Sequence, residues 1–258
     1  MSIAVVTGGA GDIGRQICGV LGRAGYEIAV VDLNAEKCET FAAQLREESV
    51  SAFAAPADIT DTASVADMAR TVLARGAVDA VINNAGVAYA PDFETTDEDS
   101  WSAALDVNLT GAYRVSRQFL PHMQAMRRGV VVNISSGNGV TYAGAPAYSI
   151  AKAGLIHFTR MLAVEYGRYN IRALSVVPGS VRTQAWAHRA EINPNIFDEI
   201  RRWYPLGRIV EAREVANVVA FAVSDAASAM TGSSLFVDCG GLAGNTVMSE
   251  EMTRGDRD

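Results

Sequence analysis

The sequence predicts an α/β fold with one doubly wound parallel sheet of seven strands and helices on both faces. Short, β-branched apolar runs alternate with longer stretches of helical period. Most of these runs are apolar at consecutive positions, which is typical of strands that helices cover on both sides. The chain has 258 residues, a length that a single hydrophobic core can stabilise. We therefore expect one domain built around one sheet.

Seven apolar runs are expected to form the strands, since each is short, rich in β-branched residues and bounded by polar or turn-forming residues. The intervening segments are long enough for right-handed crossovers between parallel strands. The expected strands are Ile3–Thr7, Ile28–Val31, Ser51–Ala57, Ala80–Ile82, Val130–Ile134, Ile171–Val177 and Ser234–Val237.

Three of the intervening helices begin after a good N-cap residue. They are a stretch over Ala35–Glu48 after Asn34, one over Thr62–Arg75 after Asp61, and a longer one after Asp97 that extends toward Met126. Residues 249–258 are polar, and we expect them to form a tail without fixed structure. Residues 1–248 are expected to form the domain.

Composition and charge argue against several classes of function. A net charge of -7 and a pI near 5.1 provide no positive field for a nucleic-acid backbone. No stretch approaches the ~18–20 apolar residues of a membrane span. The chain starts Met1-Ser2 with no basic leader, and its three cysteines, Cys18, Cys38 and Cys239, are far apart. We therefore expect a cytoplasmic protein that binds neither nucleic acid nor a membrane.

The histidines give no sign of a metal centre. His122, His157 and His188 are scattered and lack metal-ligand spacing, and no G-x-S-x-G nucleophile motif is present. Surface histidines, or histidines with satisfied hydrogen bonds, are the simpler interpretation. We expect no metal ion.

A glycine-rich turn follows the first expected strand and precedes a helical stretch. At such a junction, backbone N–H groups and the helix N-terminus face a pyrophosphate, and Gly14 permits close packing of the helix on the sheet. A tight turn without a ligand is the alternative for the glycines alone. The turn reads Thr7-Gly8-Gly9-Ala10-Gly11-Asp12-Ile13-Gly14.

Asp32 ends the second expected strand, at roughly the 20-residue offset of a carboxylate that binds the adenosine ribose hydroxyls. Its charge would repel a 2′-phosphate, and the next residues, Leu33, Asn34 and Ala35, include no cation. A helix cap is the alternative role for Asp32. Because the acid and the turn occur together, the sequence favours NAD over NADP.

Tyr148 and Lys152 lie four residues apart at the start of a long helical stretch, so both side chains can reach one site. A free tyrosine titrates near ~10, and a nearby cation favours its phenolate. Lys152 is a candidate for that cation, which would suit Tyr148 to proton transfer. A surface tyrosine–lysine pair is the alternative, but the chain contains only one other lysine, Lys37, so coincidence is a poor explanation.

These motifs, with Asn83-Asn84-Ala85-Gly86 and Asn133-Ile134-Ser135-Ser136, resemble the short-chain dehydrogenase/reductase family in order and approximate spacing. The resemblance covers nearly the whole chain. It implies a Rossmann-like fold, a variable substrate lid over residues 184–209 and a homotetramer. It also implies four catalytic residues: Tyr148 as general acid/base, Lys152 on the nicotinamide ribose, Ser136 on the substrate oxygen, and Asn108 in a water-linked proton relay.

The same resemblance implies the residues that bind the cofactor. Asp58 and Ile59 would flank the adenine, and Val181 and Thr183 would meet the nicotinamide amide. For Asn84 and Asn108, a buried asparagine that satisfies the backbone is the alternative role. The full expected set is Gly8, Asp12, Ile13, Gly14, Asp32, Leu33, Asp58, Ile59, Asn84, Ala85, Gly86, Tyr148, Lys152, Pro178, Gly179, Val181 and Thr183.

Three departures from the family pattern bear on these roles. Asp12 stands where the family has a glycine, and it places a negative charge near the expected pyrophosphate. The interval from Ser136 to Tyr148 is one residue shorter than the common spacing, which leaves Ser135 as a rival to Ser136. Leu174 replaces the usual asparagine of its strand.

The sequence thus predicts an NAD-dependent oxidoreductase that interconverts a secondary alcohol and its ketone, with polyols and sugar-derived alcohols as the preferred substrates. Two alternatives are an NADP-linked carbonyl reductase and a catalytically silent dinucleotide-sensing protein. The lid aromatics either line a substrate pocket or pack on the core, and its arginines either meet an anionic substrate or form a solvated face. These residues are Trp186, Trp203, Tyr204, Arg189, Arg201 and Arg202.

Overall fold

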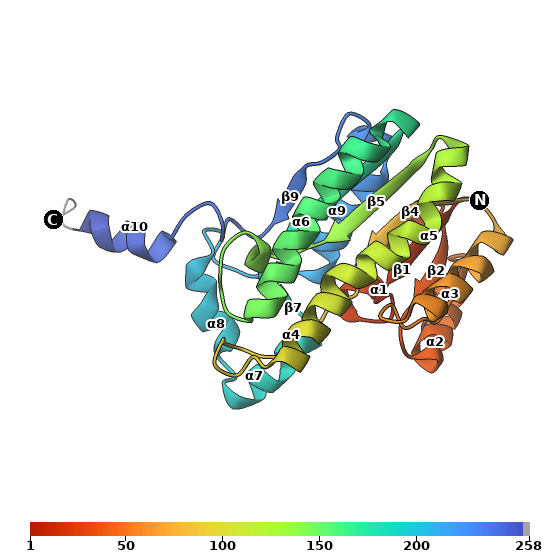
Figure 1. The fold of residues 1–258 in the computed structure, drawn as a ribbon. Helices are drawn as coiled ribbons and strands as arrows, with labels where there is room; N and C mark the ends of the chain where they lie inside the picture. The colour runs from red at the N-terminus through yellow and green to blue at the C-terminus, as the bar shows by residue number, and fades with distance from the viewer. Residues whose placement is uncertain (255–258) are drawn as a thin grey trace.

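Seven parallel strands form the central sheet within residues 1–254, which the computed structural model describes apart from the side chains of residues 185, 187 and 188 (Figure 1). The strands are β1 (Ile3–Thr7), β2 (Glu27–Val31), β3 (Ala52–Ala54), β4 (Val78–Asn83), β5 (Gly129–Ile134), β6 (Ile171–Pro178) and β9 (Ser234–Val237). Their order is β3-β2-β1-β4-β5-β6-β9, and all neighbours pair in parallel. The predicted fold class is confirmed.

The strand order reverses between β1 and β4, and this reversal positions the candidate site. From β1 the chain winds outward through β2 and β3, then returns to β4 and winds the other way. The chain therefore leaves β1 and β4 toward opposite sides of the sheet. The carboxyl edge between these two strands is where open α/β sheets bind ligands. Thr7 pairs with Val31, and Asn83 pairs with Asn133, so neighbouring strands end close to this edge.

Helices cover both faces of the sheet, and each face has its own apolar core (Figure 1). The main helices are α1 (Asp12–Arg23), α2 (Ala35–Glu47), α3 (Thr62–Arg75), α4 (Glu98–Leu105), α5 (Gly111–Met126), α6 (Pro146–Tyr166), α7 (Ala187–Ile192), α8 (Ile196–Ile200), α9 (Ala212–Val223) and α10 (Thr246–Thr253). One core packs α1, α2 and α9 on the sheet, and Ile17 and Val219 belong to it. The other packs α3, α5 and α6, and includes Phe119 and Leu162. In the described part of the chain, no helix combines the length and the apolar character needed to cross a bilayer.

The helix starts expected from the sequence are confirmed. The side chains of Asn34, Asp61 and Asp97 accept hydrogen bonds from backbone N–H groups in the first turns of α2, α3 and α4. Each cap satisfies donors that a helix leaves unpaired at its N-terminus. Helix α2 ends at Glu47, one residue earlier than expected.

The long helical stretch after Asp97 is divided into three parts, whereas the sequence predicts one. A π-helical turn, η1 (Asp106–Thr110), separates α4 from α5. Such a turn inserts an extra residue into the helical repeat and is frequent at functional sites. Asn108 lies within it and is 1% exposed.

Strand β3 is shorter than its expected range of Ser51–Ala57. Pro56 lacks an N–H group, and the β2–β3 ladder ends at Ala54. A second sheet, which the sequence does not predict, pairs β7 (Val181–Arg182) with β8 (Val210–Glu211) in parallel. Strands of two residues are too short for a recognisable pattern. This small sheet joins the two ends of residues 184–209, the segment expected to be the lid.

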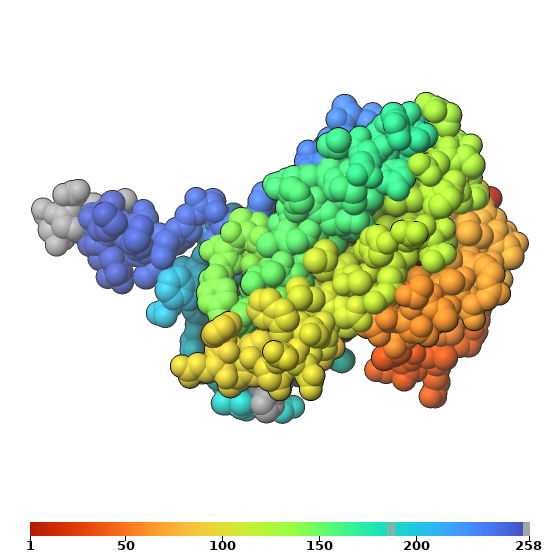
Figure 2. Space-filling view, in the orientation of Figure 1, coloured from red at the N-terminus to blue at the C-terminus, as the bar shows by residue number. Residues whose placement is uncertain are grey.

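The C-terminal residues form an arm that stands off the body of the protein (Figures 1 and 2). Its main element is α10, and Asn245 caps this helix by accepting a hydrogen bond from the N–H of Met248. The expectation of an unstructured tail from Ser249 onward is therefore wrong as far as Thr253, because a helix capped upstream extends into the polar segment. Residues 255–258 lie outside the described residues.

Candidate active site

The glycine-rich turn joins β1 to α1 at the reversal of strand order. Gly8 has a φ of +61°, a left-handed conformation that favours glycine. A Cβ atom at Gly14 would clash with the carbonyl oxygen of Gly8, so the first turn of α1 packs directly on the loop. Gly11 is the N-cap of α1 and carries no side chain. The helix N-terminus thus meets the carboxyl edge of the sheet without a side-chain cap, an arrangement that suits a phosphate group.

Asp32 lies beside this turn at the end of β2. Its Oδ2 atom accepts a hydrogen bond from the backbone N–H of Ala10 over 3.2 Å. The cap of α2 is Asn34, so the alternative role of Asp32 as a helix cap is wrong. Leu33, the next residue, is exposed. The acid and the phosphate turn are therefore in direct contact.

The loop after β4 is tied to the same turn. The backbone N–H groups of Asn84 and Ala85 donate to Thr7 Oγ1 over 3.0 and 3.1 Å, and Asn84 Nδ2 donates to the carbonyl oxygens of Thr7 and Gly8. A Cβ atom at Gly8 would lie 2.9 Å from Ala85 Cα. Thr7 is a site residue that the sequence analysis misses; its position between an apolar strand and the glycines is the available signal.

Lys152 and Asn108 meet at Gly86. A Cβ atom there would lie 2.7 Å from Asn108 Oδ1 and 3.0 Å from Lys152 Nζ. Lys152 is 2% exposed, and its Nζ donates to the carbonyl oxygen of Ile134 over 2.9 Å. Asn108 Nδ2 donates to the carbonyl oxygen of Val87 over 2.7 Å, and its Oδ1 accepts from the N–H of Val87 over 3.2 Å. Asn108 therefore satisfies the backbone and also faces the site.

The two serines after β5 have different partners. Ser135 is buried, and its hydroxyl donates to the carbonyl oxygen of Lys152 over 2.8 Å. Ser136 is half-buried, accepts a hydrogen bond from the N–H of Asn138 over 3.2 Å, and lies close enough to Tyr148 to lower the pKa of its hydroxyl. Ser136 therefore lies next to the side chain of Tyr148, whereas Ser135 is bonded to the backbone of α6.

Helix α6 presents Tyr148 and Lys152 on one side, as their spacing predicts. Lys152 Nζ lies 5.5 Å from the centroid of the Tyr148 ring. Pro146 begins the helix, and Ala145 before it has a φ of +51°. The N–H of Ala145 donates to the carbonyl oxygen of Pro91 over 2.7 Å. This contact fixes the entry of the chain into α6 and hence the position of Tyr148.

Burial sets the protonation of this pair. It lowers the pKa of Lys152 to about 8, because the ammonium group loses its contact with water. Burial also raises the pKa of Tyr148, and the hydrogen bond with Ser136 opposes that rise in part. The sequence predicts that the Lys152 ammonium favours the Tyr148 phenolate. In this structure the effect of burial is larger, and the amine donates to the carbonyl oxygen of Ile134.

Asp58 and Ile59, expected beside the adenine, form the loop after β3. Asp58 Oδ1 accepts hydrogen bonds from the hydroxyl and the N–H of Thr60 over 2.6 and 2.8 Å, which holds the pKa of Asp58 below its ordinary value. Ile59 is 9% exposed, and its side chain lies against Gly111 at the start of α5. Asp58 therefore stabilises this loop through hydrogen bonds with Thr60, and Ile59 packs the loop against the start of α5.

The loop after β6 carries the last expected cofactor residues and leads into the lid. The N–H of Gly179 donates to the carbonyl oxygen of Val237 over 3.0 Å, which fastens the Pro178-Gly179 turn to β9. Val181 is buried in β7, and the hydroxyl of Thr183 donates to the carbonyl oxygen of Val181 over 3.4 Å. These residues follow β6 at the same edge of the sheet as the phosphate turn.

Tyr204 anchors the segment over residues 184–209, the expected lid, to the body of the protein. Its hydroxyl donates to Ser180 Oγ over 2.7 Å and accepts from the N–H of Ser180 over 3.1 Å. A Cβ atom at Gly241 would lie 2.7 Å from the Tyr204 ring. Of the two roles considered for the lid aromatics, Tyr204 therefore packs on the body. Trp186 packs within the lid, on Phe197, with 5.9 Å between ring centroids.

Two of the three histidines have described side chains, and one of these, His157, is exposed on α6. His122 Nε2 accepts a hydrogen bond from the N–H of Val78 over 3.3 Å, which is a structural role. The side chain of His188 lies outside the described residues. Among the side chains that the structure describes, no three His, Cys, Asp or Glu groups are arranged to hold a metal ion.

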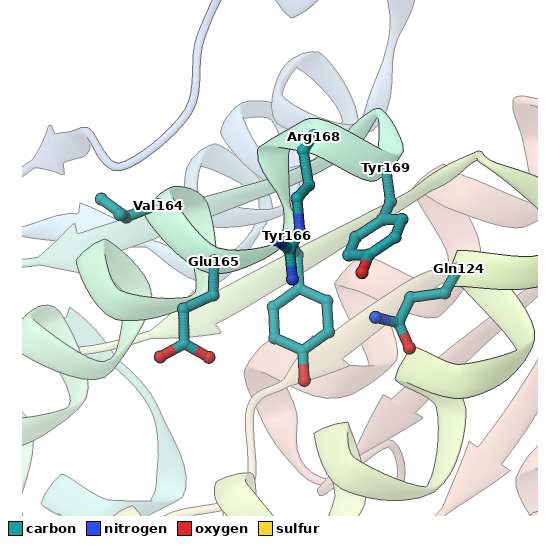
Figure 3. Close-up of a pocket in the computed structure, with 6 residues that line it drawn as sticks. All are labelled: Gln124, Val164, Glu165, Tyr166, Arg168 and Tyr169. Atoms are coloured by element: carbon teal, nitrogen blue, oxygen red, sulfur yellow. The ribbon is translucent and has the colours of Figure 1, made fainter.

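A separate cavity of about 260 Å³ lies at the other end of α6 (Figure 3). Tyr148 is near the start of α6 and Tyr166 is its last residue. At a rise of ~1.5 Å per residue they lie about 27 Å apart along the axis, so this cavity is no part of the candidate active site. It is lined by Gln124, Val164, Glu165, Tyr166, Arg168 and Tyr169.

Comparisons with known sequences agree with this geometry. The profile of a family described as Enoyl-(Acyl carrier protein) reductase matches residues 8–241. An uncharacterized oxidoreductase of Schizosaccharomyces pombe is 36% identical over 251 residues, covering 97% of this chain and 94% of that protein. The 2,3-dihydro-2,3-dihydroxybenzoate dehydrogenase of Bacillus subtilis is 33% identical, with coverage of 94% and 96%.

Solved structures show the same fold. An oxidoreductase of the short-chain dehydrogenase/reductase family from Burkholderia thailandensis superposes with a TM-score of 0.93 at 40% identity, covering 98% of this chain and 97% of that one. A gluconate 5-dehydrogenase from Burkholderia cenocepacia, solved with NADP and tartrate, has a TM-score of 0.89 at 29% identity, covering 94% and 96%. Chains of this architecture thus include one that binds NADP.

Proposed function

The chain belongs to the short-chain dehydrogenase/reductase family of oxidoreductases, and we propose that it interconverts a secondary alcohol and its ketone with NAD as cofactor. The observation that carries this proposal is the hydroxyl pair of Tyr148 and Ser136, beside the buried amine of Lys152. A proton-transferring hydroxyl and a second hydroxyl that holds the substrate oxygen are what carbonyl–alcohol interconversion requires.

The residues around the glycine-rich turn fit a dinucleotide. Gly8 and Gly14 keep side chains away from the junction of β1 and α1, where a Cβ atom at either position would meet backbone. The N-terminus of α1 attracts an anion such as a pyrophosphate. Asp32 lies at the end of β2, where its carboxylate can accept hydrogen bonds from ribose hydroxyls. When bound, the nicotinamide cofactor supplies or accepts the hydride.

Four side chains transfer the proton and position the substrate and cofactor in this proposal. Tyr148 gives its hydroxyl proton to the substrate oxygen as a ketone is reduced, and accepts a proton as an alcohol is oxidised. Ser136 holds that oxygen and orients it toward Tyr148. Lys152 places a positive charge on the cofactor side of Tyr148, and Asn108 holds Gly86 and Val87 in place next to Lys152.

Asp32 and the contacts of Arg15 support NAD over NADP. The Asp32 carboxylate would repel a 2′-phosphate at the adenosine ribose. Arg15 is the cation of the first turn of α1, and its Nε donates to the carbonyl oxygen of Ala10 over 2.9 Å. Its guanidinium also lies 4.4 Å from the centroid of the Phe41 ring and donates to Gln44. These partners hold Arg15 in place, so it cannot move to a phosphate without losing them.

Polyols and sugar-derived alcohols are the proposed substrates. By their names, the Bacillus subtilis relative acts on a cyclic diol and the Burkholderia cenocepacia one on gluconate. Both substrates carry a secondary alcohol with a further hydroxyl next to it. We also propose a homotetramer in the cytoplasm. The three cysteines are free and buried, which fits a reducing compartment.

The test combines cofactor binding with turnover. We expect NADH to quench the tryptophan fluorescence of the wild type at concentrations at least about tenfold below NADPH, because of Asp32. A panel of secondary alcohols should then yield NADH absorbance.

Tyr148→Phe should bind NADH as the wild type does but lose about 100-fold or more in turnover, because the proton donor is removed. Tyr169→Phe, at the far end of α6, is the matched control and should leave turnover unchanged.

Each alternative function has its own outcome. Tighter binding of NADPH than NADH would contradict the role of Asp32 and support an NADP-linked carbonyl reductase. NADH binding without turnover of any alcohol or ketone, in the wild type as in Tyr148→Phe, would support a dinucleotide-sensing protein.

A further inference from the structure

Asp12 makes a contact that links the phosphate-binding turn to the lid. It is the first residue of α1, and its Oδ2 atom accepts a hydrogen bond from the backbone N–H of Gln184 over 2.6 Å. The two residues are 172 positions apart in the sequence. A hydrogen bond to a carboxylate is shorter and stronger than one between neutral groups. This bond therefore joins two distant parts of the chain at one point.

Gln184 is the first residue of the lid, so the bond holds the base of that segment. It begins the turn η4 (Gln184–Trp186), which the N–H of Trp186 closes by donating to the carbonyl oxygen of Thr183. The Trp186 ring packs on Phe197, and the guanidinium of Arg182 lies 4.3 Å from the centroid of the same Phe197 ring. The lid helices are thus packed on one another directly after the point that Asp12 holds.

The carboxylate of Asp12 lies among cations. A cavity of about 340 Å³ at the junction of α1 with β7 and β8 is lined by Asp12, Arg15, Arg182, Glu211 and Arg213, among others. Arg182 Nε donates to Glu211 Oε1 over 3.2 Å, across the two strands that close the lid. Three arginines and a second acid thus line the same cavity as Asp12, and Arg182 is paired with that second acid, Glu211.

We propose that Asp12 is a positioning residue, which fastens the base of the lid to the phosphate-binding turn and weakens cofactor binding by doing so. The inference rests on the proposed function, because it takes the N-terminus of α1 as the site of the pyrophosphate. The positive end of the α1 dipole attracts both the Asp12 carboxylate and the pyrophosphate. Removal of the charge should therefore strengthen cofactor binding, whereas removal of the hydrogen bond should free the lid.

Three variants separate these two effects. Asp12→Asn keeps an oxygen acceptor and loses the charge, and Asp12→Ala loses both. Gln184→Pro keeps the charge and removes the N–H donor, and proline is tolerated at the first position of a helical turn. The matched control is Glu98→Ala, which removes a first-turn carboxylate from a different helix, α4. All are made in the full chain.

Two measurements distinguish the variants. Hydrogen exchange of the Trp186 amide, without nucleotide, reports the lid. We expect it to be at least about tenfold faster in Asp12→Ala and Gln184→Pro, and close to wild type in Asp12→Asn. Fluorescence titration with NADH reports cofactor binding. We expect affinity to rise about threefold in Asp12→Asn and Asp12→Ala and to stay unchanged in Gln184→Pro.

The two halves of the proposal can be overturned separately. Two results for hydrogen exchange of the Trp186 amide would show that the hydrogen bond does not fasten the lid. One is an equal exchange rate in Asp12→Ala and the wild type. The other is an equally fast rate in Asp12→Asn and Asp12→Ala. Unchanged NADH affinity in Asp12→Asn would exclude the effect on the cofactor. If the wild type binds no NADH, the proposed function fails, but the exchange measurement still decides whether Asp12 holds the lid.

Discussion

At the scale of single residues, the buried amine of Lys152 should make folding stability depend on pH. Its pKa is about 8 in the folded protein against 10.5 for an ordinary lysine, so between these values the unfolded chain holds a proton that the native amine has lost. Lys152 alone therefore adds a rise of the free energy of unfolding with pH in this window, by at most about 1.4 kcal/mol per pH unit, whereas buried thiols with raised pKa values, such as Cys38, add a fall. Urea denaturation of the wild type and Lys152→Met at several pH values below about 10 should show this rise in the difference between the two proteins, because the other titrating groups are common to both. Parallel stability curves for the two proteins would show that the amine is not buried as described.

The sequence places individual residues side by side where spacing within one helix determines their neighbours. Tyr148 and Lys152 lie side by side because residues four apart share one face of a helix. This holds for any helix, so the spacing alone predicts it. The choice between Ser135 and Ser136 depends on the partner of each hydroxyl: that of Ser135 donates to the carbonyl oxygen of Lys152, whereas that of Ser136 lies near Tyr148, which the sequence does not show. Leu174 is similar: it is fully buried in the core that includes α1, α2 and α9, so the departure from asparagine adds an apolar side chain to an apolar region.

At the scale of secondary-structure elements, the short turn η2 (Gly137–Gly139) controls the distance between Ser136 and α6. A Cβ atom at Gly139 would lie 2.7 Å from the carbonyl carbon of Lys152, so Gly139→Ala should push η2 away from α6. We expect a loss of about 1–3 kcal/mol in stability and of about tenfold or more in turnover. Gly167→Ala is the matched control, because a Cβ atom there meets nothing within 4 Å and its φ of -55° suits alanine.

Denaturation and turnover of the two variants are compared with the wild type. Gly167→Ala should keep full turnover and gain about 0.5–1 kcal/mol, since alanine restricts the unfolded chain. A Gly139→Ala variant that retained full turnover would show that η2 does not set the position of Ser136.

Elements differ in how far the sequence determines them. The starts of the helices after Asn34, Asp61 and Asp97, and strands such as β1 and β9, are predicted to the residue, because their signals are local. The π-helical turn at Asp106–Thr110 lies where α4 and the turn itself pack on α6, and the β7–β8 pair joins residues about thirty positions apart. Neither has a local pattern. The bond between Asp12 and Gln184 is of the same kind: the sequence shows an unusual acid, and only the fold shows its partner.

At the scale of the whole molecule, two exposed aromatic side chains on different elements mark the surfaces through which we expect the proposed tetramer to form. On one, Tyr113 of α5 is 43% exposed and packs edge-on against Phe158 of α6. On the other, Phe236 is 51% exposed on β9, the last strand at one edge of the sheet. An exposed edge strand with an aromatic side chain is usually covered. Two different surfaces that each pair with their own copy generate a tetramer with perpendicular two-fold axes.

A charged substitution in one interface should therefore reduce the tetramer to a dimer, and a second one in the other interface should reduce the dimer to a monomer. The wild type, with a protomer of 27.3 kDa, is expected to sediment as a tetramer. Tyr113→Asp and Phe236→Asp should each give dimers, because each places a charge in one of the two interfaces and leaves the other intact. The double variant should be a monomer. Sedimentation velocity at micromolar concentration measures all four proteins. If the wild type is a monomer, the two apolar surfaces do not serve self-association; if either single variant remains a tetramer, the surface that it alters lies outside the interfaces.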